Sequence, residues 1–147
     1  MTSLSFTNLR IFIEEDVHPI YTSLTRGTLE NKNSQDRAEN IPFIKMPDLF
    51  MAAACAGVKE NIYRDLGTKK RDIFVADAFD TKTQIPILIA LAYKKNHDLD
   101  DLSDPKKILN ICEGWANGGI HLINEEILSG EGLRPLYRLI DFIIKTE

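Results

Sequence analysis

The apolar positions of this chain are most concentrated at residues 45–57, where they predict a helix that the rest of the chain surrounds. Pro47 suits the first helical position, where its missing N–H is not needed, and Asp48 places a carboxylate at the positive end of the helix dipole. The alanines that follow and Cys55 make the segment apolar nearly all round, as a fully buried helix is. Gly57 is expected to end this helix, since glycine adopts the left-handed C′ conformation at low cost.

Near the N-terminus the apolar residues alternate instead of following helical spacing. Residues 9–13 are rich in β-branched and aromatic side chains, and their alternation predicts a strand with Asn8 and Arg10 on its outward face. A helix is predicted from about Asp16, because apolar residues then recur at i, i+3, i+4 and i+7. Gly27 is expected to end that helix.

Three more helices are predicted in the second half of the chain. The first follows a capping sequence at 80–83 and is apolar on most sides, so we expect it to be buried. The second begins at Pro105 and continues in phase across the glycine pair at 118–119, for which close helix packing is the expected reason. The last begins at Pro135. The short apolar segment 73–75 fits either a strand or a helical turn.

Together these elements predict a mainly α-helical protein with five or six helices and one short N-terminal strand. Its 147 residues are enough for one compact domain with a core but too few for two, so we expect residues 1–147 to form a single domain. The polar stretch 30–40 contains no apolar residue except Ala38, which indicates a flexible loop at about 28–41. That loop is either a solvated insertion or a segment that becomes ordered on binding.

The charge of the chain bears on its partners. A net charge of −4 argues against a protein that coats nucleic acid through bulk electrostatics, although a local basic patch is compatible with it. The one concentrated basic segment is 59–71, whose cations suit phosphate contacts that do not read sequence. A solvated face or a docking patch for a protein partner is the alternative. The candidate nucleic-acid-binding residues of this segment are Lys59, Arg64, Lys69, Lys70 and Arg71.

A second way to contact DNA would use the predicted N-terminal strand. In ribbon-helix-helix repressors a strand precedes a helix, and outward strand residues enter the major groove. Asn8 and Arg10 would be those residues here, and their side chains suit adenine and guanine edges. The gap from Gly27 to Pro47 is much longer than the tight turn of that fold, so such a regulator is an alternative and not the leading hypothesis.

Candidate catalytic and metal-binding patterns are weak. No Gly-rich phosphate loop, nucleophile elbow or zinc-peptidase motif is present, and His18, His97 and His121 show no ligand spacing. The acidic segment 98–104 makes a metal-dependent nuclease or hydrolase the rival hypothesis, although it lacks the glycine and the closing glutamate of a calcium-binding hand. We therefore expect no enzyme activity, no cofactor and no resident metal.

The cysteines and the apolar runs indicate where the protein resides. Cys55 and Cys112 lie in apolar helical patterns without metal-ligand spacing, so both are expected to be reduced core residues. The N-terminus has no basic region followed by an apolar stretch, and the apolar run 85–93 is far too short to span a membrane. These features predict a soluble protein of the cytoplasm with no membrane partner.

Three blocks of the sequence are similar to those of a known family. They are FIKMPDLFMAAACAGV at residues 43–58, KKRDIF at 69–74 and EGWANGGI at 113–120, within a matching span of roughly 43–128. Taken together they resemble the DNA phosphorothioation-associated protein 4 family. Its members are small bacterial proteins encoded beside systems that put sulfur into the DNA backbone and restrict unmodified DNA.

The resemblance implies a defence context and no particular reaction. With the lack of a catalytic constellation, it suggests a non-enzymatic accessory or adaptor protein of a bacterial DNA phosphorothioation or phage-defence system. The expected partners are other proteins of the same system. DNA is a further candidate partner, and a homo-oligomer is left open.

Overall fold

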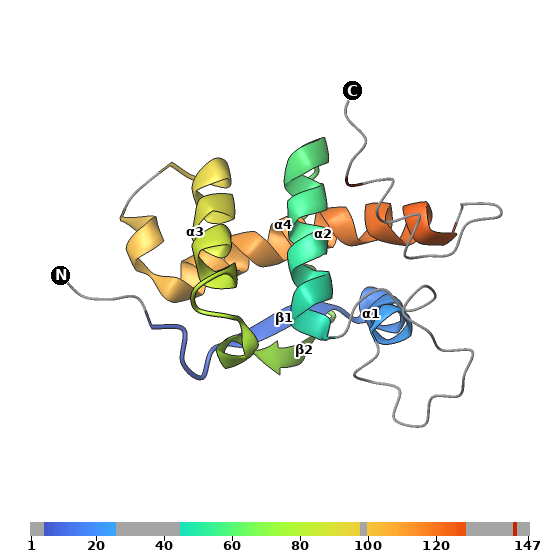
Figure 1. The fold of residues 1–147 in the computed structure, drawn as a ribbon, viewed down its shortest axis with the longest axis horizontal. Helices are drawn as coiled ribbons and strands as arrows, with labels where there is room; N and C mark the ends of the chain where they lie inside the picture. Colours follow the sequence, from blue (N-terminus) through green and yellow to red (C-terminus); the bar gives the residue numbers. More distant parts are fainter. Residues whose placement is uncertain (1–4, 26–44, 98–99, 129–142, 144–147) are drawn as a thin grey trace.

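The computed structural model describes residues 5–25, 45–97, 100–128 and 143. These residues form four α-helices, one pair of antiparallel strands and three short 3-10 turns, so the predicted mainly α-helical class is confirmed (Figure 1). The expected count of five or six helices is wrong for the described part of the chain, which has four. The helix predicted to begin at Pro135 and the polar loop at about 28–41 lie outside the described residues.

The strands β1 (Arg10–Glu14) and β2 (Lys70–Val75) pair antiparallel within the chain. The predicted N-terminal strand is thereby confirmed, with a shift of one residue. The ambiguous segment 73–75 is part of β2, because Phe74 lies opposite Ile11 across the pair. Alternate side chains of β1 are buried, as its alternating sequence predicts.

Helix α1 (His18–Leu24) follows β1 after a 3-10 turn at Glu15–Val17. It ends earlier than predicted, at Leu24 and not at Gly27, which lies outside the described residues. The reason is that Thr25 adopts an extended backbone, while its buried hydroxyl donates a hydrogen bond of 2.8 Å to the Tyr21 carbonyl. This bond satisfies one of the carbonyl groups that a helix end leaves without a partner.

Helix α2 (Met46–Glu60) begins where the sequence predicts, but Gly57 does not end it. The helix continues to Asn61, which takes the left-handed C-cap conformation with φ of 55°. Gly57 instead lies in the helix, where a Cβ atom would overlap the Trp115 carbonyl oxygen. Its lack of a side chain therefore serves close packing and not helix termination.

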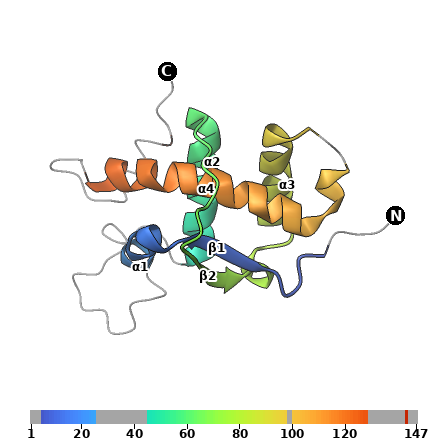
Figure 2. The same cartoon turned by 180° about the vertical axis from the view of Figure 1, so that it is seen from behind.

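Helix α4 (Pro105–Leu128) is continuous across Gly118 and Gly119, as predicted. It crosses α2, passing behind that helix in Figure 1 and in front of it in the reversed view of Figure 2, while the strand pair lies beside one end of α2. A Cβ atom on Gly119 would overlap the Ala53 carbonyl oxygen of α2, and one on Gly118 would overlap the carbonyl of Ile62. Close helix packing is thus confirmed as the reason for Gly119, while Gly118 makes room for the segment that follows α2.

Helix α3 (Gln84–Lys95) stands beside α2 on the same side of α4 (Figure 1). We expected it to be buried on most sides, but only Leu88, Leu91 and Ala92 are buried in it. Tyr93, for example, is 46% exposed. The reason is that α3 packs on α2 and α4 by one face only and has no described element over its other face. No described helix is both long enough and apolar enough to cross a membrane.

Candidate functional site

The structure separates cations that the sequence places together in 59–71. Lys59 lies in the last turn of α2 at the rim of an apolar groove, whereas Lys70 begins β2 and lines a polar cleft. Arg71, the next residue of β2, forms an exposed ion pair with Glu15, with 3.5 Å between Nη1 and Oε1. The predicted basic segment is therefore not one continuous patch.

The other two cations of that segment lie in the connection from α2 to β2, which is fixed through its backbone. The Arg64 N–H donates to the Gly114 carbonyl at 3.1 Å, and the Arg64 carbonyl accepts from Asn117 Nδ2 at 3.2 Å. The Lys69 carbonyl accepts the Glu15 N–H at 3.0 Å. Both residues are exposed on a segment whose backbone is well anchored.

A polar cleft of about 570 Å³ joins the two separate predictions of DNA contact. Asn8 and Arg10, from the predicted strand, line it together with Lys70, from the basic segment. We call it the strand cleft. The side chains that the sequence did not indicate as site residues are Leu9, Phe12, Lys106, Leu109 and Asn110. Only Phe12 carried a signal, since the alternating pattern places it on the outward face of the strand with Asn8 and Arg10.

The strand cleft is positively charged. It is lined by Arg10, Lys70 and Lys106, and no carboxylate is among its described lining residues. Arg10 pairs with Asp72 across the two strands, where both side chains are about half exposed. Neither Lys70 nor Lys106 forms an ion pair with another described residue. Two lysine charges are therefore available to an anionic ligand.

The backbone of Asn8, which lines the strand cleft, has a fixed conformation. Its φ of 65° is in the left-handed region, which asparagine enters more readily than most residues do. Its N–H donates to Asp77 Oδ1 at 2.9 Å, although Asp77 is far away in the sequence. The Asn8 side chain therefore starts from a fixed backbone position.

Glu113 of α4 is buried behind β1. Its Oε2 accepts the Phe12 N–H at 2.7 Å, and only 6% of the residue is exposed. Burial raises the pKa of this carboxyl group to about 7, while the hydrogen bond from Phe12 and the positive charge of Lys70 oppose the rise. At neutral pH the group is therefore only partly ionised, and it offsets the lysine charges incompletely.

The remainder of the 113–120 block holds the fold together. Gly114 leaves room for the Tyr63 ring, which would overlap a Cβ atom at that position. The same ring packs edge-on against Trp115, with 5.1 Å between the ring centroids. Trp115 Nε1–H donates to the Leu91 carbonyl at 3.0 Å and so ties α4 to α3. These residues of the block are explained by packing alone.

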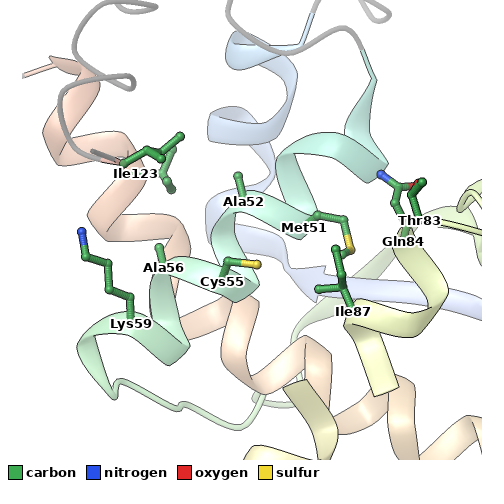
Figure 3. Close-up of a pocket in the computed structure, with 10 residues that line it drawn as sticks. Met51, Ala52, Cys55, Ala56, Lys59, Thr83, Gln84, Ile87 and Ile123 are labelled. Carbon is green, nitrogen blue, oxygen red and sulfur yellow. The ribbon is translucent and has the colours of Figure 1, made fainter. Parts of the chain in front are cut away.

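An apolar groove of about 540 Å³ lies between α2, the beginning of α3 and the second half of α4 (Figure 3). Met51 and Cys55 of α2 point toward Ile87 of α3, and Ile123 of α4 lies at the other side of the groove. Cys55 is exposed, so the expectation that it is a core residue is wrong, although Cys112 is buried as predicted. Cys55 lies in this open groove, which Ile87 of α3 and Ile143 also line. Partial burial raises the pKa of the Cys55 thiol, which therefore stays protonated and poorly nucleophilic.

The acidic segment 98–104 gives the rival hydrolase hypothesis no support in the described part of the chain. Residues 98–99 lie outside the described residues. The Ser103 N–H and hydroxyl donate to the backbone carbonyl oxygen of Asp100. The Asp104 carboxylate caps α4 by accepting the Lys106 N–H at 3.0 Å. No group of three or more histidine, cysteine or acidic residues suited to a metal occurs among the described residues.

A comparison with family models identifies one that matches residues 26–147, which is most of the chain. Its description is DNA sulphur modification system-associated protein 4. The matched range contains α2, β2, α3 and α4, whereas β1 and α1 precede it. No curated protein and no solved structure matches the chain.

Proposed function

The chain belongs to the DNA sulphur modification system-associated protein 4 family, and from this premise we propose that it is a non-catalytic accessory protein that binds DNA and other proteins of that system. The observation that carries the DNA part of the proposal is the strand cleft. It gathers three cations in a protein whose net charge is −4. Such a local concentration of Lys and Arg suits contact with phosphate groups.

The apolar groove supports the protein-binding part of the proposal. Among the described residues, which include Ile143 in its lining, the groove is an open apolar surface rimmed by polar residues such as Lys59 and Thr83. Such a surface is typical of protein interaction sites. The groove and the strand cleft share no lining residue, so a partner protein and DNA would occupy separate surfaces. With separate surfaces, an adaptor would be able to hold its partner protein and DNA at the same time.

The proposal extends to the setting of the protein. We propose that residues 1–147 act as one domain in the cytoplasm. The polar stretch at 28–41 would be a loop of that domain. We also propose that two copies of the chain could associate through the apolar groove.

The protein-binding part is tested by purifying the tagged full-length chain from its native host under mild conditions. The expected result is that other proteins encoded with the modification system co-purify with it. Recovery of the chain alone, at native expression levels, contradicts the adaptor role.

The DNA-binding part is tested by gel shifts with duplex DNA over a salt series. The Lys70→Gln/Lys106→Gln variant removes two predicted phosphate contacts, so the slope of log affinity against log salt should fall by about 1.8. The Lys82→Gln/Lys94→Gln variant removes the same charge away from the strand cleft and should keep the wild-type slope. If the slope falls equally in both variants, DNA binding depends on the net charge of the protein and not on the strand cleft.

A further inference from the structure

Phe12 is the feature of the strand cleft that phosphate contacts do not explain. The neighbours Ile11 and Ile13 point into the core, but Phe12 lines the cleft and is only partly buried. An aromatic ring is usually more stable when it is fully buried in the core than when it is partly exposed beside positive charges. It is therefore a candidate for contact with a ligand that has a flat, apolar face.

One face of the Phe12 ring is open to a polar group. Lys70 Nζ lies over this ring, 5.2 Å from its centroid. A flexible lysine that reaches the ring face through the cleft shows that the face is not covered by packed side chains. A planar group that displaced the ammonium would stack on the ring, and Lys70 would be released to contact a phosphate.

The remaining lining residues suit the other parts of a nucleotide. Lys106 supplies a second charge for the backbone, while Asn8 and Asn110 supply amide groups that both donate and accept hydrogen bonds. The apolar side chains of Leu9 and Leu109 border the same space. The volume of about 570 Å³ is within the range of roughly 300–1,000 Å³ that is usual for pockets that take small organic groups.

The shape of the site favours unpaired bases over a duplex. In a duplex the base faces are stacked on one another, so a ring inside a cleft has no access to them. An unpaired base exposes both faces and is able to enter a concave site, as in aromatic-lined grooves that bind single strands. We propose that the strand cleft binds single-stranded DNA, with one base stacked on Phe12 and the flanking phosphates held by Lys70 and Lys106. This rests on the proposed DNA-binding function and specifies its substrate.

The test is fluorescence anisotropy with a labelled oligothymidine of about 12 nucleotides and with a duplex of the same length. The wild-type chain should bind the single strand more tightly than the duplex. Phe12→Leu keeps an apolar side chain but removes the ring, so single-strand affinity should fall about 5- to 100-fold at constant salt. Phe12→Tyr keeps the ring and should retain most of the affinity.

The salt dependence separates stacking from charge. Phe12→Leu should leave the slope of log affinity against log salt unchanged, whereas Lys70→Gln/Lys106→Gln should lower it by about 1.4 for a single strand. Thermal unfolding followed by circular dichroism shows whether each variant is folded, and a misfolded Phe12→Leu leaves Phe12→Tyr and the two lysine substitutions to carry the test.

Each result bears on one of the two claims. If duplex and single strand bind equally well and Phe12→Leu has no effect, the single-strand inference is wrong while the DNA-binding function stands. If neither nucleic acid binds at low salt, the DNA-binding function fails as well, and the cleft is better explained as a docking site for an acidic protein segment.

Discussion

Helix α4 contributes to two regions of opposite character. Its second half crosses α2, where Gly118 and Gly119 bring the backbones together and leave no space for a side chain. Its first half borders the strand cleft, where Lys106 and Asn110 are exposed beside an open polar space. The crossing is closely packed, whereas the cleft is open and charged. One helix thus holds the fold with its second half and borders the proposed binding surface with its first half.

The largest expected effect comes from filling the crossing. Gly119→Ala places a methyl group against the Ala53 carbonyl, which belongs to the backbone of α2 and has no rotamer to change. Although alanine favours helix by about 1 kcal/mol, we expect the free energy of unfolding to fall by about 3 kcal/mol, since the clash is with backbone. Urea unfolding followed by circular dichroism measures this change.

The matched control is Gly67→Ala. An added Cβ there lies 3.3 Å from Glu14 Oε2, a side-chain atom that is able to move. Its free energy of unfolding should stay within about 0.5 kcal/mol of wild type. If both variants lose a comparable free energy of unfolding, contact with the α2 backbone is not the reason that position 119 requires glycine.

The next largest effect concerns Glu113, which lies between the two regions. Its pKa is raised from 4.5 to about 7 in the folded chain, so the folded state holds a proton that the unfolded state releases between these values. The contribution of this group to stability is therefore fully present below pH 4.5 and is lost as pH rises through 7. The loss is of the order of 3 kcal/mol at most.

Glu113→Gln tests this assignment. The amide remains neutral and its oxygen is still able to accept the Phe12 N–H. The variant should gain stability relative to wild type as pH rises from 5 to 8, when unfolding is measured at several pH values. The groups that face Glu113 are Lys70 from β2, Tyr63 from the connection and Cys112 on α4 itself. A difference that does not change with pH would show that Glu113 is ionised throughout.

Much of the dense region was predictable from the sequence because its signals are local. A proline marks the start of α4, and apolar residues stay in phase across its glycine pair. The prediction failed at Gly57, because a glycine that permits close packing and one that ends a helix look identical until the partner helix is known. The N-terminal strand was found for the same local reason, through its alternation.

The strand cleft was not predictable as a site, because it forms from three segments that are distant in the sequence. Asn8, Arg10 and Lys70 were singled out for two different reasons, and nothing in the sequence indicates that they share a cleft. Lys106 and Asn110 become relevant only when α4 passes β1. The prediction of one basic patch was wrong, because Lys59 and Lys70 are close in the sequence but line different surfaces in the fold.

A smaller effect is expected from Trp115→Phe. This change removes the hydrogen bond from Nε1 to the Leu91 carbonyl while an aromatic ring remains to pack against Tyr63. The free energy of unfolding should fall by about 1–2 kcal/mol, because the buried carbonyl loses its partner and the smaller ring leaves space. A loss below about 0.5 kcal/mol would indicate that this hydrogen bond contributes little to holding α3 on α4, where the Cys112 thiol also donates to the Leu88 carbonyl.

The smallest effect on stability is expected from Arg10→Gln. The Arg10–Asp72 pair is about half exposed on both sides, so its loss should change the free energy of unfolding by less than about 0.5 kcal/mol. Single-strand binding, in contrast, should weaken measurably, because Asp72 then remains as an unpaired negative charge beside the cleft. A large loss of stability would mean that the strand cleft also maintains the fold.

The most direct test of this division is a heteronuclear NMR titration of the full-length chain with oligothymidine. Backbone amide shifts should change for Asn8, Arg10, Phe12, Lys70 and Lys106 at the strand cleft, and those of Met51, Cys55 and Ile87 at the apolar groove should stay in place. Changes that gather at the apolar groove, or no changes at low salt, would contradict the assignment of the strand cleft as the DNA-binding surface.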